Sequence, residues 1–137
     1  MLGEKISEAT GKVSSIRWLP GGDYRYVKME VNLSESGKLL GMDAVNMGTY
    51  AVFERVPGQL YGEGQGMLAT SDGHTAIWNA HGVGKMTGQG MGASYRFSCA
   101  VQAPTTGPLA RLNGVLLIGE HEADNDGNTK TTLWEWK

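Results

Sequence analysis

The chain is poor in the features that mark secreted, membrane-spanning and nucleic-acid-binding proteins. Cys99 is the one cysteine among 137 residues, so no internal disulfide forms and nothing indicates an oxidising compartment. No apolar run approaches the length of a membrane span, and the first residues, MLGEKISEAT, lack the apolar core of a signal peptide. The net charge of −2 lacks the basic bias of nucleic-acid-binding proteins. We therefore expect a cytoplasmic protein with neither a nucleic-acid nor a membrane partner.

Common catalytic and cofactor motifs are absent from the sequence as well. The three histidines, His74, His81 and His121, are far apart and lack the spacing of metal ligands. The chain has no glycine-rich nucleotide loop and no serine elbow of the hydrolase type. Asp124 and Asp126 resemble the start of a calcium loop, but the final glutamate is missing, so a hairpin turn explains them. We expect neither a metal nor a cofactor, and the motifs leave enzyme activity undecided.

Glycine, by contrast, is abundant and regularly placed. Ten of the thirty-five residues from Gly58 to Gly92 are glycine, and eight of them fall in clusters at every second position. The clusters are Gly62, Gly64 and Gly66; Gly82 and Gly84; and Gly88, Gly90 and Gly92. Because strand side chains alternate between two faces, each cluster places its glycines on one face of a strand. A glycine inside a strand costs about 0.5–1 kcal/mol relative to alanine. A closed barrel offsets that cost, since its strands bend sharply and approach one another closely.

The rest of the sequence also predicts strands. Turn residues divide the chain into segments of roughly ten residues, and no segment keeps a helical apolar period. Tyr24–Leu33 is the clearest strand, and Gln59–Thr70 is the first strand with alternating glycines. Ser34–Gly37 is an expected turn, and Leu109–Glu122 is an expected long strand or two strands bent at Gly114 or Gly119. Eight or nine strands at this spacing predict a barrel or a sandwich, and the glycines favour the barrel. We predict a single all-β domain over residues 1–137, an antiparallel, calycin-like β-barrel of about eight strands.

The residues that line such a barrel depend on which way the glycines point. If they point outward, the interior holds the candidate ligand-binding residues, which are Tyr61, Glu63, Gln65, Asn79, His81, Tyr95 and Glu120. A carboxylate in a dry cavity has a raised pKa unless it is paired, so Glu63 or Glu120 would act as an acid or base on a bound molecule. If the glycines point inward, backbone, Trp78, Ser94 and Arg96 line the cavity instead. Then Glu63, Gln65 and His81 are solvated on the outer wall.

Four runs of sequence carry a resemblance to known proteins. Leu60–Gly66, Ser71–Gly73, Leu109–Val115 and Leu133–Lys137 resemble a family of small uncharacterised prokaryotic proteins, over about Gly11 to Lys137. More distantly, the alternating glycine strands resemble barrels of the allene oxide cyclase type. That resemblance implies an eight-stranded antiparallel barrel with an apolar cavity, often oligomeric. The plant enzyme isomerises an unstable fatty-acid epoxide in a shaped pocket, but its catalytic positions have no residue-by-residue match here.

Three functions fit these observations, in the following order of preference. The first is a barrel that binds a small apolar or amphipathic molecule in its cavity. The second is a homo-oligomeric structural or interaction module, anchored by exposed aromatic residues at Trp18, Tyr24, Trp134 and Trp136. The third is a cofactor-free isomerase or cyclase that uses a glutamate in the cavity.

Overall fold

The computed structural model describes residues 1–20, 28–88 and 90–137. Its eight strands are β1 (Leu2–Trp18), β2 (Lys28–Leu39), β3 (Met42–Val56), β4 (Gln59–Thr70), β5 (Thr75–Met86), β6 (Ala93–Gln102), β7 (Leu116–Ala123) and β8 (Asn128–Trp136). One 3-10 turn, η1 (Ala110–Leu112), lies between β6 and β7. Tyr24, which the sequence offered as an interface anchor, falls outside the described residues.

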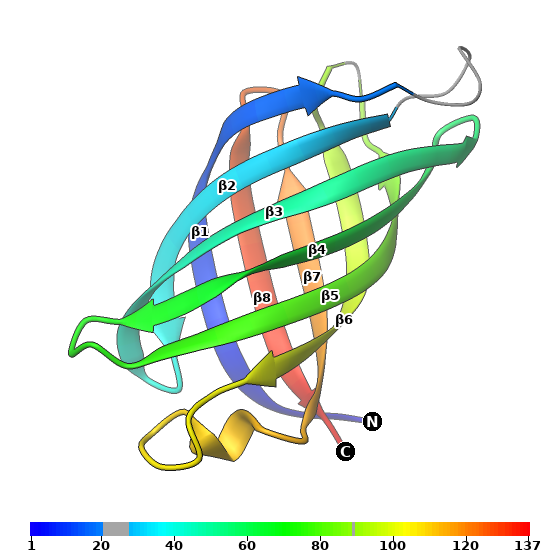
Figure 1. Cartoon of the computed structure of the whole chain (residues 1–137). Coiled ribbons are helices and arrows are strands. Elements are labelled where there is room, and N and C mark those ends of the chain that lie inside the picture. The colour runs from blue at the N-terminus through cyan, green and yellow to red at the C-terminus, as the bar shows by residue number, and fades with distance from the viewer. Residues whose placement is uncertain (21–27, 89) are drawn as a thin grey trace.

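The strands form a closed barrel in which each strand pairs with the next along the chain (Figure 1). All eight pairings are antiparallel, and β8 pairs back with β1 from Leu2↔Trp136 to Lys12↔Asn128. The prediction of an all-β, antiparallel barrel of about eight strands is confirmed. Among the described residues, no helix has the length and apolar character of a membrane span.

Two boundaries differ from the sequence prediction. The expected turn at Ser34–Gly37 is wrong, because β2 continues through it and pairs there with residues 44–47 of β3. The chain turns instead at Leu40 and Gly41, which have positive φ angles of 51° and 81°. The expected strand Leu109–Glu122 begins only at Leu116. Before it, Leu109 at the start of η1 and Leu112 within η1 are both buried, and η1 lies across one end of the barrel (Figure 1).

The glycines of β4 and β5 point inward and make room for aromatic side chains. A Cβ atom on Gly66 would lie 2.6 Å from the indole ring of Trp78, and one on Gly119 would overlap the ring of Phe97. A Cβ atom on Gly84 would likewise overlap the ring of Tyr95. Large rings therefore lie directly against bare backbone in the barrel wall, which is a use for glycine that curvature alone did not predict.

Two apolar clusters fill the interior. The first joins Ile6, Leu39, Leu68, Leu117, Leu133 and their neighbours to Leu109 and Leu112 at the η1 end of the barrel. The second is smaller and consists of Val31, Val52, Leu60, Ala93 and Tyr95. Side chains from both clusters border the cavity described next.

Candidate functional site

A cavity of about 90 Å³ lies inside the barrel. Its wall is mostly apolar and includes Leu33, Leu68, Trp78, Ala80, Phe97, Cys99 and Leu133. One edge is polar, and it is formed by Glu35, Asn46, Tyr50, His121 and Thr131. A mostly apolar pocket with a few converging polar groups is typical of a ligand site.

Glu35 anchors the polar edge. The residue is only 2% exposed, and both of its carboxylate oxygens accept hydrogen bonds. Oε1 accepts from Asn46 Nδ2 at 3.2 Å, while Oε2 accepts from the hydroxyls of Thr129 at 2.8 Å and Thr131 at 2.9 Å. Since an ionised carboxylate is an acceptor with no proton to donate, three converging donors are the environment that such a group requires in the core.

The hydrogen bonds continue from Thr131 to the imidazole of His121. Nδ1 of His121 lies 2.7 Å from Thr131 Oγ1. The Thr131 hydroxyl already donates its proton to Glu35, so Nδ1 must be the donor in this pair. The free lone pair of the neutral ring is then on Nε2, which lies 3.5 Å from the hydroxyl of Tyr50. The barrel thus holds the basic nitrogen and the phenol together at the cavity.

A second branch reaches Glu35 from the opposite side. Trp78 Nε1 donates to Asn46 Oδ1 at 2.7 Å, and Asn46 donates in turn to Glu35. The two branches draw on five strands: β2 for the carboxylate, β3 and β5 for one branch, and β7 and β8 for the other. Every donor in this network points toward the carboxylate, which fixes the orientation of the side chains between them.

Burial sets the protonation states around the cavity. Desolvation lowers the pKa of His121, against the opposing effect of the Glu35 and Glu122 carboxylates. Burial raises the pKa of Tyr50, with smaller contributions from Tyr95 and Glu35, and it raises the pKa of Tyr95 to about 12. Near neutral pH the imidazole is therefore uncharged and the phenols are protonated. Burial also raises the pKa of the Cys99 thiol to about 12, so Cys99 is not an activated nucleophile.

The structure requires a correction to the predicted cavity lining. Of the seven candidates, Tyr95 points inward and is 6% exposed. The side chains of the other six, which are Tyr61, Glu63, Gln65, Asn79, His81 and Glu120, lie on the outer wall. Glu63 and His81 belong to strand segments beside the cavity, but their side chains are 49% and 61% exposed and face each other at 3.6 Å. Tyr61 stacks on Phe53 and lies beneath the guanidinium of Arg55.

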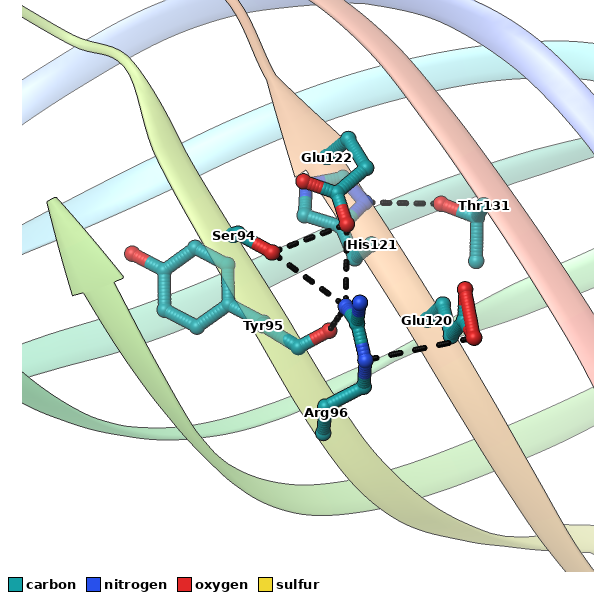
Figure 2. A network of polar contacts seen from close by, with 7 residues as sticks. All are labelled: Ser94, Tyr95, Arg96, Glu120, His121, Glu122 and Thr131. Atoms are coloured by element: carbon teal, nitrogen blue, oxygen red, sulfur yellow. Dashed lines mark hydrogen bonds and ion pairs between the residues drawn. The ribbon is translucent and has the colours of Figure 1, made fainter. Parts of the chain in front are cut away.

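Figure 2 shows the separation of inner and outer residues on β6 and β7. Arg96 contacts Glu122 at 2.9 Å and Glu120 at 3.9 Å, and the side chain of Glu120 is 45% exposed. The rings of Tyr95 and His121 lie behind the same ribbons, with His121 joined to Thr131 (Figure 2). Adjacent residues of a strand point to opposite faces, so the inward glycines of β4 and β5 send Glu63 and His81 outward. Ser94 and Arg96 are also outside, while Trp78 lies within.

The sequence does not predict the polar edge of the cavity, because its turn residues place Glu35 in a turn. A usable signal was present: Val31 and Leu33 alternate with polar residues, and the same alternation carries on to Glu35 and then to Leu39. Likewise, His121 follows Leu117 and Gly119 at a spacing of two. A carboxylate and an imidazole that continue apolar strand faces are candidates for buried functional groups.

Comparisons with known proteins identify the fold. No protein-family model matches the chain, and no curated protein sequence matches it. The structure is similar to that of a protein with unknown function from Clostridium acetobutylicum, with a TM-score of 0.81, 9% identity and 98% of each chain covered. It is also similar to a conserved protein of unknown function from Rhodopseudomonas palustris, with a TM-score of 0.78, 13% identity, and 98% of this chain and 97% of the other covered. At these identities the likeness establishes a shared small barrel fold.

Proposed function

We propose that this barrel binds a small, neutral and mainly apolar molecule in its interior, and that the molecule carries one oxygen atom that accepts a hydrogen bond. The observation that carries the proposal is the cavity of about 90 Å³, which is apolar except where Tyr50, His121 and Thr131 meet it. An apolar wall favours transfer of an apolar molecule from water, and the polar edge fixes its orientation.

The charges at the site favour a neutral ligand. Glu35 is buried beside the cavity, and its hydrogen-bond partners, Asn46, Thr129 and Thr131, are all neutral. An anionic ligand would meet this carboxylate in a medium of low dielectric, where like charges repel strongly. A carbonyl or ether oxygen has no such penalty and can accept a hydrogen bond from the hydroxyl of Tyr50.

Two probes test the proposal. Xenon reports whether the apolar cavity admits a guest, and acetone adds a carbonyl oxygen. Both are titrated into isotopically labelled protein while the indole N–H signal of Trp78 is followed by NMR. We expect both probes to shift that signal. We expect Tyr50→Phe to weaken the binding of acetone and to leave the binding of xenon unchanged. Native mass spectrometry of freshly purified protein would also report a co-purified ligand.

A pair of neighbouring substitutions separates cavity binding from surface binding. Ala80→Leu places extra volume in the cavity wall, and Asn79→Leu places the same side chain on the outer surface. We expect Ala80→Leu to abolish the xenon and acetone shifts and Asn79→Leu to retain them. If neither probe shifts the signal in the unsubstituted protein, or if Ala80→Leu binds as well as Asn79→Leu, cavity binding is refuted.

We also propose, as a second function, self-association through the outer face of β3, β4 and β5. Met47, Met67 and Ile77 are exposed and stand opposite one another in register, with Ser34 and Gln102 at the two ends of the row. The adjoining row is Ser36, Val45, Ala69 and Thr75, which also carries no charge. Interface cores are depleted in charge and enriched in methionine. Because an uncharged face is complementary to itself, a second copy of this chain is the proposed occupant.

Light scattering coupled to size-exclusion chromatography tests this second function. We expect a dimer that becomes a monomer in Ile77→Lys, because a lysine there would be desolvated without a partner. His81→Lys, on the same strand and the same face but beyond the uncharged rows, is the matched control and should remain dimeric. A monomer at high concentration of the unsubstituted protein would refute self-association.

A further inference from the structure

We propose that His121 acts as a general base, with Tyr50 as the hydrogen-bond donor to the carbonyl oxygen, and moves a proton at the carbon next to the carbonyl group of a small ketone or aldehyde bound in the cavity. This inference rests on the proposed function, since it requires a carbonyl compound in that cavity. The sequence-based candidates for acid–base chemistry, Glu63 and Glu120, lie on the outer wall and take no part in it.

His121 and Tyr50 are placed to act together on a molecule in the cavity. Nε2 of His121 and the hydroxyl of Tyr50 are 3.5 Å apart and both residues border the cavity. The two rings pack edge to face, with centroids 5.6 Å apart, and Tyr95 packs against both. A carbonyl compound at this edge has its oxygen within reach of a phenol donor and its neighbouring carbon within reach of a basic nitrogen.

The proton inventory of the reaction balances without a cofactor. Nε2 takes a proton from the α-carbon, the C–H electron pair becomes the C=C bond of an enolate, and the carbonyl π pair moves to oxygen. Tyr50 stabilises that oxygen by hydrogen bonding. Return of the proton from Nε2 to the same carbon regenerates the ketone. In heavy water, the protium on Nε2 first exchanges for a solvent deuteron, and that deuteron is returned to the carbon. No oxidant, reductant or metal is consumed.

Glu35 is the positioning residue of this site. When Nε2 gains a proton, the imidazole becomes a cation inside an apolar barrel, which is costly without a nearby negative charge. The Glu35 carboxylate is linked to the ring through Thr131, at 2.9 Å and 2.7 Å, and it holds Nδ1 in the protonated form that leaves Nε2 free. A carboxylate behind a histidine fixes the tautomer and stabilises the imidazolium in the same way as in other acid–base sites.

Hydrogen exchange of acetone in heavy water tests the pair. The loss of the methyl proton signal is followed by NMR with unsubstituted protein, His121→Gln and Tyr50→Phe at equal fractions of bound acetone. We expect His121→Gln to lose roughly 10²-fold in rate, as is typical when a general base is removed, and Tyr50→Phe to lose about as much, as when an oxyanion donor is removed. His81→Gln, on the outer wall, is the control and should exchange at the unsubstituted rate.

The outcomes distinguish the reaction from binding. If acetone binds in the cavity and exchanges no faster with the unsubstituted protein than with His121→Gln, the acid–base inference is overturned while the proposed binding function stands. If acetone does not bind, both are overturned. If His121→Gln fails to fold, the comparison is made with Tyr50→Phe, and an exchange rate unchanged in that variant overturns the inference.

A pH profile provides an independent readout. The titratable groups facing the His121 ring are Tyr50 of β3, Tyr95 of β6 and Glu35 of β2, while β8 contributes the neutral Thr131 and Glu122 lies on the outer face of β7. We expect exchange to fall at low pH with the midpoint at which NMR shows His121 to titrate. Glu35→Gln should move the midpoint of the exchange rate and the midpoint of the His121 titration to lower pH together, because the Glu35 carboxylate raises the pKa of His121. Midpoints that do not coincide, or do not move in Glu35→Gln, overturn the assignment.

Discussion

At the level of single residues, Glu35 determines how the polar edge of the cavity is built. Its carboxylate receives donors from Asn46, Thr129 and Thr131, and through Thr131 it sets the tautomer of His121. None of these groups would be stable alone in an apolar barrel, because each has hydrogen-bonding capacity that water cannot reach. Because each group supplies a hydrogen bond that its neighbour needs, loss of one group leaves the others without a partner in the core.

The first residue-scale prediction concerns the stability of this network. Glu35→Ala removes the shared acceptor and leaves three donors facing one another around a new void. We expect the free energy of unfolding, measured in urea, to fall by about 3–5 kcal/mol, because the buried donors of Asn46, Thr129 and Thr131 each lose their acceptor at a cost of about 1–3 kcal/mol, partly offset by relaxation. Glu63→Ala removes a carboxylate from the outer wall, and its effect should stay within about 0.5 kcal/mol. Equal effects of the two substitutions would contradict the burial of Glu35.

The second residue-scale prediction is a pH dependence of stability from His121. Burial lowers the pKa of His121 in the folded protein below its unfolded value of about 6.5, so at acid pH the unfolded chain binds the extra proton. The contribution of the uncharged His121 to the free energy of unfolding is therefore complete above about pH 6.5. It is lost as the pH falls from there through the pKa of His121 in the folded protein.

Urea unfolding between pH 7.5 and pH 5 measures this contribution. We expect the free energy of unfolding to decrease with a slope of up to about 1.4 kcal/mol per pH unit, and His121→Gln to remove that slope. The lowered carboxyl pKa values of Glu8, Asp72 and Asp124 act at lower pH, below about 4.5, and so lie outside this range. A slope that persists in His121→Gln would assign the effect to another group.

At the level of the strands, the inward glycines differ in what they accommodate, and this yields a matched pair of substitutions. At Gly119 a methyl group would overlap the ring of Phe97, while at Gly62 it would meet only the Ala51 carbonyl oxygen at 3.6 Å. Neither residue has a positive φ angle. We expect Gly119→Ala to lower the free energy of unfolding by about 1–3 kcal/mol through overpacking. Gly62→Ala should raise it by about 0.4–1 kcal/mol, because alanine has less freedom in the unfolded chain.

The same glycines show how far the sequence predicts the molecule. The barrel class and strand Gln59–Thr70 follow directly from turn residues and alternation, because both are local properties of the chain. The inner face of β4 does not follow, because a period of two is satisfied equally by either face. The choice depends on Trp78, which packs across Gly48 and Gly66 from a different strand. That non-local contact places the glycines inside and therefore Glu63 and His81 outside. Glu35 is missed for a different reason, because the turn expected at Ser34–Gly37 is part of strand β2.

At the level of the whole molecule, closure joins the two ends of the chain. The amino group of Met1 lies 2.6 Å from the carbonyl oxygen of Lys137, and the amide of Lys137 donates back to the carbonyl of Met1 at 2.8 Å. Both ends lie together at the η1 end of the barrel (Figure 1). Each strand has hydrogen-bonded neighbours on both sides, so the order of strands around the barrel does not depend on where the chain starts.

This arrangement predicts that the chain can be circularly permuted without losing its cavity. A short glycine linker from Lys137 to Met1, with new ends between Asp72 and Gly73, interrupts an exposed turn and leaves all eight strands intact. We expect this permutant to retain the circular dichroism spectrum and the xenon shift at Trp78. New ends between Gly64 and Gln65 cut β4 where it pairs with both β3 and β5, so that permutant should fail to fold. If the β4 permutant folded and bound xenon as well as the other, the cavity would not depend on continuous strands, and the closed barrel could not be the unit that forms it.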